Sequence, residues 1–236
     1  MVKLTVVIPV FNEGENIAKE LQELESKLTV EHIVNIIYDF EEDNTIPVVL
    51  AEKNKYNTPI NLVKNLYGRG ALNAIKTGLE TAESDYVIVT MADLSDPPEV
   101  MNELVKKADT VNADIVCASR YMKGGKQIGG PFIKGLMSKY AGLSLHYLAG
   151  LPTHDATNSF KLYRTSFLKE NKIESNGGFE LGLELVVKAY LSNKKIAEVP
   201  TTWIDRANGQ SNFKIIEWLP SYLKWYFKAF GRKNEK

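Results

Sequence analysis

Short apolar runs alternate with helical apolar stripes through the first half of this chain, and that alternation limits the folds it can adopt. Residues 4–10 are almost continuously apolar, as expected for a strand that is buried on both faces of a sheet. Ile17, Leu21, Leu24 and Leu28 then recur at steps of four, three and four, which places them on one face of a helix. The same reasoning predicts further strands at residues 33–38, 60–63, 86–91 and 114–118, and further helices at residues 47–53, 69–82 and 97–108.

Strands that alternate with helices predict an α/β fold with a mostly parallel central sheet and helices on both faces. The 236 residues are enough for one large domain, and no linker divides them, so we expect a single domain over residues 1–236. In such sheets, ligands bind beyond the carboxyl ends of the strands. The polar residues at those ends are therefore the first candidates for a functional site.

The second half of the chain has a different character. A glycine-rich segment at residues 123–130 predicts a mobile loop. Residues 159–163 predict an outlying strand, and residues 196–204 predict another strand with Pro200 at a bend or an edge. The remaining helices are expected at residues 132–148, 179–191 and 215–230, the last of them interrupted by Pro220.

The charge balance and the cysteine content exclude some classes of protein. Lysine plus arginine and aspartate plus glutamate both number 29, so there is no basic excess for bulk binding to nucleic acid. The single cysteine, Cys117, forms no internal disulfide, which is compatible with a reducing compartment. We expect no signal peptide, because the first residues lead directly into a strand, and no apolar run approaches the roughly 20 residues of a membrane span.

Four polar patterns fall at the ends of the predicted strands. They are the PVFNE stretch at residues 9–13, DFEEDNT at 39–45, GRGALNA at 68–74 and TMADLSDPPE at 90–99. Each has an ordinary structural explanation when taken alone, such as a helix cap or a solvated acidic turn. All four at successive strand ends favour a ligand site.

Together these patterns resemble the family-2 glycosyltransferases with the GT-A fold, and within them the dolichol-phosphate mannosyltransferase type. The resemblance spans residues 2–213 and continues in Ser119-Arg120-Tyr121, in the DATNSFK stretch at residues 155–161 and in the late motif of Arg206, Gly209 and Ser211. The chain departs from the family at several positions. Phe40 and Glu41 stand where glycine and serine are usual, and Met91 stands where the first acidic residue of Asp-x-Asp is usual.

The resemblance implies a sugar donor carried on a nucleoside diphosphate, either UDP or GDP, whose leaving diphosphate is neutralised by Mg²⁺ or Mn²⁺. Asp93 is the expected carboxylate ligand of the metal, with Asp96 as a second candidate. A thioether is a poor ligand for these hard cations, so Met91 is not expected to bind the metal. The residues implied for nucleotide-sugar binding are Pro9, Asn12, Glu13, Asp39, Asp43, Asn65, Gly70, Ala92 and Asp93.

The acceptor that the resemblance favours is a polyprenyl phosphate. A phosphate monoester is largely ionised at neutral pH and is already a nucleophile, so it needs positive charge more than a general base. The acceptor half is expected in residues 119–236 and the donor half in residues 1–118. The residues implied for acceptor-phosphate binding are Arg120, Lys134, Lys139, Arg206 and Ser211, and those implied for catalysis are Asp93, Arg120, Asp155 and Arg206.

Two alternatives remain open at this point. Transfer to a cell-surface glycan would need a carboxylate base, for which Asp96 and Asp155 are candidates. A nucleotide-sugar-binding protein that has lost turnover would be consistent with Met91.

The closing helix, a pair of glutamates and the three histidines also bear on the site. The closing helix carries many aromatic and cationic residues, so it is either packed on the core or lies in the headgroup region of a membrane. A lipid acceptor favours peripheral contact, at the cytoplasmic membrane face. Glu180 and Glu184 share one helix face and are expected to support the site. His32, His146 and His154 form no spaced ligand set and are interpreted as structural.

Overall fold

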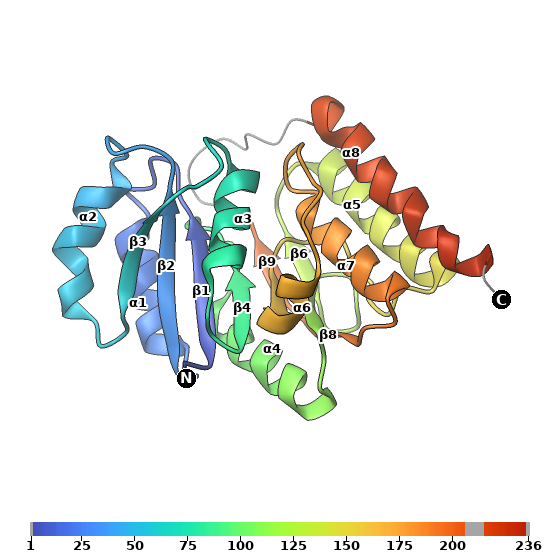
Figure 1. The fold of residues 1–236 in the computed structure, drawn as a ribbon, viewed down its shortest axis with the longest axis horizontal. Helices are drawn as coiled ribbons and strands as arrows, with labels where there is room; N and C mark the ends of the chain where they lie inside the picture. Colours follow the sequence, from blue (N-terminus) through green and yellow to red (C-terminus); the bar gives the residue numbers. More distant parts are fainter. Residues whose placement is uncertain (1, 206–214, 235–236) are drawn as a thin grey trace.

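A seven-stranded sheet forms the centre of the molecule (Figure 1). The computed structural model describes residues 2–205 and 215–234. The strands of this sheet are β1 (Leu4–Pro9), β2 (His32–Tyr38), β3 (Ile60–Lys64), β4 (Tyr86–Val89), β5 (Ile115–Ser119), β7 (Lys161–Arg164) and β8 (Ile196–Pro200). Their order is β3-β2-β1-β4-β7-β5-β8, and all pairs are parallel except the two that β7 makes. The predicted α/β class with a mostly parallel sheet is confirmed.

Helices cover both faces of the sheet, as the apolar runs require, because every residue of β1, β4 and β5 is buried. One core cluster packs α1, α2 and α4 on the sheet, and the other packs α3, α6, α7 and α8 on the opposite face. The helices are α1 (Ile17–Lys27), α2 (Thr45–Glu52), α3 (Ala71–Thr81), α4 (Pro98–Val111), α5 (Phe132–Ser144), α6 (Thr165–Glu170), α7 (Leu181–Leu191) and α8 (Ile215–Lys228). Three short helical segments complete them: η1 (Lys53–Lys55), η2 (Leu145–Ala149) and η3 (Ala229–Asn234).

The strand expected at the periphery lies inside the sheet. β7 runs antiparallel between β4 and β5, where Lys161 pairs with Val89 on one side and with Cys117 on the other. The prediction of an outlying strand was therefore wrong. A run of five residues shows that a strand exists, but its neighbours depend on the path of the chain between distant elements.

The strand predicted at residues 196–204 is two strands in different sheets. β8 ends at Pro200, and β9 (Thr202–Ile204) pairs in parallel with β6 (Lys126–Ile128) in a small second sheet. Because β6 lies within the glycine-rich segment, that segment is partly ordered by pairing. The sequence predicted a mobile loop here and no strand, because three residues are too short for a periodic pattern.

Two helical segments differ from the sequence prediction in form. The helix expected at residues 132–148 is α5 followed by a π-helical turn, η2, which ends at Gly150 with a positive φ of 83°. By contrast, α8 continues through Pro220 without a break. In Figure 1, α8 runs beside α5 at the end of the molecule opposite α2, and a hydrogen bond of 2.9 Å between the Ser144 and Tyr226 hydroxyls joins the two.

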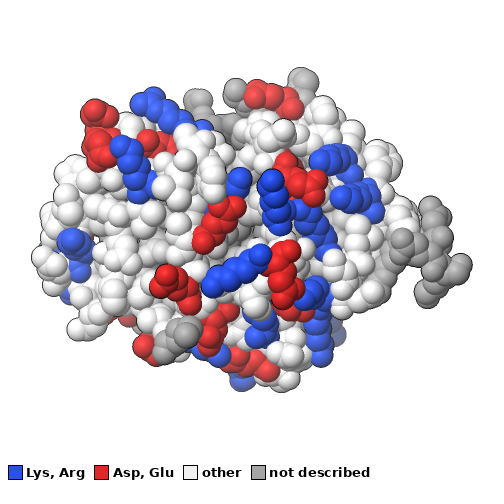
Figure 2. Space-filling model, in the orientation of Figure 1, with Lys and Arg blue, Asp and Glu red and all other residues white. Residues whose placement is uncertain are grey.

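Charge is mixed on the face that carries α3, α6 and α7. Figure 2 shows acidic and basic side chains interspersed over it, with no field of one sign. This agrees with the equal numbers of acidic and basic residues in the sequence.

Candidate active site

Asp39 joins the ends of two strands to the start of a helix. Its carboxylate accepts hydrogen bonds from Asn65 Nδ2 at 2.7 Å and from the Gly70 amide at 2.8 Å. Gly70 has a φ of 121°, which a glycine adopts without strain. Three of the residues predicted for the donor site therefore lie together beyond β2 and β3.

Asp43 organises the loop after β1. Its Oδ2 accepts the Asn12 amide at 3.0 Å and its Oδ1 accepts the Thr45 amide at 2.9 Å, while the Glu13 amide donates to Thr45 Oγ1 at 2.9 Å. Asp43 is buried, with both oxygens engaged by backbone amides. Its geometry therefore fits support of the Asn12-Glu13 loop better than direct contact with a nucleotide.

Aromatic side chains lie at the same edge of the sheet. Phe11, which is half exposed, meets Phe40 edge to face at a centroid distance of 5.8 Å. The Arg69 guanidinium lies 4.7 Å from the centre of the Phe40 ring. The departure of Phe40 from the family pattern thus adds an aromatic surface beside Asp39, where a nucleobase can stack.

The acidic turn after β4 brings two carboxylates to the centre of this edge. Asp93 Oδ1 accepts the Ser95 amide at 3.1 Å, and the Ile204 amide donates to the Ser95 carbonyl at 3.2 Å, so the turn is tied to β9. Asp96 is buried, and one of its oxygens has no hydrogen-bond partner among the described residues. Burial and the Asp93 carboxylate, against the opposing effect of Arg120, together raise the pKa of Asp96 to about 7.

These two carboxylates fit a hard divalent cation. Oxygen ligands are the ones such cations prefer, and an unpartnered buried carboxylate oxygen is what a cation would satisfy. Within residues 2–205 and 215–234, no three histidine, cysteine or acidic side chains converge as a complete metal cage. A cation held here by Asp93 and Asp96 would therefore complete its coordination shell with water or with oxygens of a ligand.

Glu20 lies behind this turn and was not noticed in the sequence. It is on the buried side of α1, and neither of its carboxylate oxygens has a hydrogen-bond partner in the described part of the chain. Burial, and after it the neighbouring carboxylates of Asp96 and Asp93, together raise the pKa of Glu20 to about 8. A glutamate at a core position between Ile17 and Leu24 is the only sequence signal of this acid.

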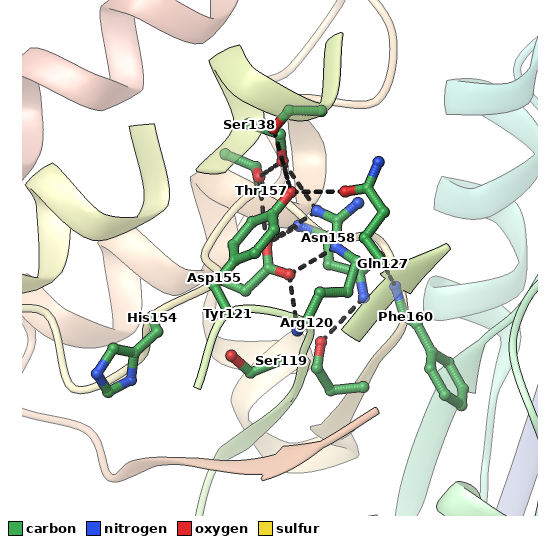
Figure 3. A network of polar contacts seen from close by, with 12 residues as sticks. Ser119, Arg120, Tyr121, Gln127, Ser138, His154, Asp155, Thr157, Asn158 and Phe160 are labelled. Carbon is green, nitrogen blue, oxygen red and sulfur yellow. Dashed lines mark hydrogen bonds and ion pairs between the residues drawn. The ribbon is translucent and has the colours of Figure 1, made fainter. Parts of the chain in front are cut away.

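Arg120 and Asp155 form a buried ion pair at the end of β5. Arg120 donates from Nε to Asp155 Oδ2 at 2.7 Å and from Nη2 to Asp155 Oδ1 at 3.0 Å, and its amide donates to Oδ2 at 3.1 Å (Figure 3). Burial alone would lower the pKa of Arg120, but the Asp155 carboxylate more than offsets this, so that the pKa lies above its usual value. The carboxylate of Asp155 is fully buried and is not free to act as a general base.

The polar face of α5 extends this network. Arg120 Nη2 donates to Ser138 Oγ at 2.9 Å, and Ser138 Oγ lies 2.7 Å from Thr157 Oγ1. Tyr121 donates to Gln127 Oε1 at 3.0 Å and also reaches Ser138 Oγ, so β6 joins the network as well (Figure 3). The loop after β5, the helix α5 and residues 155–158 thus form one hydrogen-bonded unit.

The opposite face of α5 is apolar and exposed. Phe132, Ile133 and Tyr140 are 79%, 67% and 65% exposed. On the neighbouring α8, Trp225 is buried in the core, while Leu219, Leu223 and Phe227 are exposed. We call this the α5–α8 surface, defined by the exposed residues Phe132, Ile133, Leu136, Met137, Tyr140, Tyr147, Leu148, Leu219, Leu223 and Phe227. The closing helix is therefore both packed on the core and open on its outer face.

The remaining predicted residues are distributed as follows. Lys139 is exposed on α5 and Lys134 is half-buried there, whereas Arg206 and Ser211 lie outside the described residues. Pro9 is buried at the end of β1, and Ala92 is buried in the turn that follows β4.

Glu180 and Glu184 are fully buried, and their carboxylates bind backbone amides of the loop at residues 174–178. Glu184 accepts the amides of Glu174 and Ser175, both at 2.7 Å, and Glu180 accepts the amides of Gly177 and Gly178 at 2.8 and 2.5 Å. The two carboxylates hold this loop against Trp218 of α8. Their support of the site is therefore through the position of α8.

The histidines also make structural contacts. The rings of His146 and His154 stack at 3.8 Å between centroids, and His154 Nδ1 lies 2.6 Å from Glu198 Oε1.

Comparison with known proteins agrees with this geometry. The model of Glycosyl transferase family 2 matches residues 5–171. The chain is 30% identical to a dolichol-phosphate mannosyltransferase of Pyrococcus furiosus over 94% of its own length, and it spans 64% of that protein. It is 27% identical to a polyprenol monophosphomannose synthase of Mycolicibacterium smegmatis, over 90% of this chain and 85% of that protein.

Solved structures share the fold. A glucosyl-3-phosphoglycerate synthase from Mycobacterium tuberculosis in complex with Mn²⁺, UDP and glucosyl-3-phosphoglycerate has a TM-score of 0.70 and 14% identity, over 98% of this chain and 80% of that one. The same synthase with Mg²⁺ and UDP has a TM-score of 0.69 and 15% identity, with the same coverage. The chain belongs to glycosyl transferase family 2.

Proposed function

We propose that this protein is an inverting glycosyltransferase that moves a sugar from a nucleoside-diphosphate donor to a polyprenyl phosphate. The observation that carries the acceptor assignment is the double role of α5. Ser138 on its polar face belongs to the Arg120 network, while Phe132 and Ile133 on its other face are exposed. A polyprenyl phosphate has one charged end and a long apolar chain, and it therefore needs a polar site beside an apolar surface. The names of the two curated relatives support the same class of acceptor.

The donor would bind across the ends of β1, β2 and β4. Asp39 and the aromatic pair of Phe11 and Phe40 are available to the nucleoside, and Asp93 with Asp96 would hold Mg²⁺ or Mn²⁺ against the diphosphate. The bound cation would supply charge neutralisation for the leaving diphosphate. UDP and GDP remain equal candidates for the nucleotide.

The acceptor phosphate needs cations that are not already paired. Arg120 donates two side-chain hydrogen bonds to Asp155 and one to Ser138. Its role is therefore to hold these residues in position, and its contribution to phosphate binding is indirect. Lys134, Lys139, Arg206 and Ser211 stay our candidates for direct phosphate contact. We further propose that residues 1–236 act as one domain, with donor residues in 1–118 and acceptor residues in 119–236. The insertion of β7 from the second half between β4 and β5 supports this, since both halves then share one sheet.

We propose peripheral contact with the cytoplasmic face of a membrane through the α5–α8 surface. Several large apolar side chains exposed on two adjacent helices match the chemistry of the headgroup region. Within the described residues, no helix is both long enough and apolar enough to span a bilayer.

Transfer to a glycan is the weaker alternative. That reaction needs a free carboxylate base, and Asp155 is committed to Arg120. Asp96 remains available for such a role, with a pKa of about 7. The alternative of a binding protein without turnover is supported by Met91 alone.

The decisive experiment is transfer of labelled sugar by the full chain. A panel of UDP- and GDP-linked sugars is offered with MnCl₂, with a short-chain polyprenyl phosphate or a glycan as acceptor. We expect product on the lipid phosphate only, and we expect Asp93→Asn to abolish it. Product on the glycan alone would refute the acceptor assignment, and donor binding with neither product nor donor hydrolysis would refute the enzyme assignment.

The membrane contact is tested by flotation with liposomes that contain anionic lipid. Ile133→Ser should reduce co-flotation severalfold, because Ile133 lies on the α5–α8 surface. Leu50→Ser is the matched control, since Leu50 is an exposed aliphatic residue on α2, at the far end of the molecule (Figure 1). Equal loss in both variants would contradict the proposed surface.

A further inference from the structure

Lys161 is a fully buried lysine whose ammonium group has no hydrogen-bond partner among the described residues. It is the first residue of β7 and is 0% exposed. Its Nζ makes no hydrogen bond to any residue in the described parts of the chain. An unpaired ammonium in a protein interior costs several kcal/mol of desolvation, so a position that tolerates it calls for an explanation.

The surrounding backbone leaves room for this ammonium. The helix α7 passes over β7 at Gly182, and a Cβ at that position would lie 3.3 Å from Lys161 Nζ and 3.4 Å from the Asn158 carbonyl oxygen. Any larger side chain at residue 182 would press on the amine. Gly182, the second residue of α7, thus leaves room for the amine beside the start of the helix.

Lys161 lies beside the charged groups of the candidate active site. Lys161 pairs with Val89 of β4, shortly before the acidic turn, and with Cys117 of β5, shortly before Arg120, so it lies between the strand ends that lead to these two groups. Burial lowers the pKa of Lys161, and Asp155 and Asp96, like Cys117, oppose this effect. Arg120 is already paired with Asp155, whereas Asp96 has a buried oxygen without a partner in the described part of the chain. Among the described residues, Arg120 is the other cation that acts on Asp96.

We propose that Lys161 is a positioning residue whose buried positive charge balances the carboxylates of Asp96 and Asp155, and thereby fixes the acidic turn and the Arg120–Asp155 pair relative to each other. This inference rests on the proposed function for its effect on turnover. The charge balance itself concerns only the protein's own residues. The two parts are therefore measured separately.

The charge balance is measured by unfolding, without substrate. Lys161→Met keeps the length of the side chain and removes its charge. We expect Lys161→Met to lower the urea midpoint less in the Asp96→Asn protein than in the wild type. The reason is that the neutral amide at residue 96 needs no positive charge beside it. Additive shifts in the double variant would overturn the proposal. This measurement decides the point even if the wild-type protein shows no transfer, a result that would refute the proposed function separately.

Turnover is measured per folded molecule at saturating donor and acceptor. Lys161→Met should lower kcat at least tenfold and leave the donor KM within about twofold, because the charge acts on the arrangement of the site and not on donor contact. Lys188→Met is the matched control on α7. Lys188 pairs with Glu184 at 2.7 Å, so that variant should lose stability and keep kcat. An unchanged kcat in folded Lys161→Met would overturn the positioning role.

A second variant covers the case in which Lys161→Met does not fold. Gly182→Ala keeps the charge but places a methyl group against the ammonium. We expect kcat to fall severalfold while the far-UV circular dichroism spectrum is preserved. Wild-type kcat in a folded Gly182→Ala protein would overturn the inference by itself.

Discussion

Replacing Glu20 with glutamine should remove much of the pH dependence of stability. Glu20 is buried on α1 without a hydrogen-bond partner in the described residues, and its pKa is raised from 4.5 to about 8, first by burial and then by the carboxylates of Asp96 and Asp93. The folded protein therefore holds a proton that the unfolded chain releases above pH 4.5. Stability falls as pH rises from 4.5 to about 8, and this contribution is constant above that value.

The size of the effect follows from the shift. At about 1.4 kcal/mol per pH unit, the 2.5 units between pH 4.5 and pH 7 cost about 3 kcal/mol, and the full shift costs about 5 kcal/mol at pH 9. Glutamine has the shape and polarity of the protonated acid and does not ionise. Glu20→Gln should therefore match the wild type near pH 4.5 and exceed its stability by about 3 kcal/mol at pH 7.

The assay is urea unfolding followed by circular dichroism at pH 5, 7 and 9 in EDTA, which keeps cations away from the acidic turn. Asp96 also has a raised pKa, but its contribution is present in both proteins and largely cancels in the difference. Glu15→Gln is the control, because Glu15 is exposed and its variant should show no pH-dependent gain. A stability difference between Glu20→Gln and wild type that stays constant across pH would refute the reasoning.

Three other substitutions test the fold and the site. Asp155→Asn leaves the buried Arg120 guanidinium without its charged partner and should destabilise the protein by about 3–5 kcal/mol in urea unfolding; a loss below 1 kcal/mol would contradict the buried pair. Gly78→Ala would place a Cβ 2.2 Å from Val7 Cγ1, so it should cost about 1–3 kcal/mol while kcat per folded molecule is kept; unchanged stability would argue against this close contact of α3 with β1. Met91→Asp adds a hard ligand beside the acidic turn and should tighten Mn²⁺ binding severalfold in calorimetry with the nucleoside diphosphate present, whereas weaker binding would place residue 91 away from the metal.

Local patterns were enough to predict the elements that lie in the first half of the chain. The predicted strands there differ from β1 to β5 by two residues or fewer at each end, because a continuous apolar run of that length is stable only when helices cover both faces of the sheet. The same argument predicted that Asp39, Asn65 and Gly70 would lie at one edge, and the hydrogen bonds of Asp39 join them there.

Relations between distant segments could not be predicted in this way. The antiparallel insertion of β7 and the pairing of β6 with β9 depend on contacts between residues far apart in sequence, which no local periodicity encodes. The pairing of Arg120 with Asp155 is of the same kind. The sequence predicted both residues as catalytic. Only the tertiary structure shows that they form a buried ion pair with each other.

Burial of charge is the clearest case of a property that only the fold decides. A glutamate in a helix and a lysine in a strand are usually solvated, and nothing in their neighbourhoods in the sequence marks Glu20 or Lys161 as exceptions. Their environment is set by α4, α7 and the acidic turn, which reach them from other parts of the chain. The sequence by itself determined the α/β architecture and the edge at which the site lies, because both follow from local hydrophobic periodicity. The tertiary structure alone decided which charges are buried, which are paired and which are left to act on the site, because desolvation and Coulomb energy depend on distances across the fold.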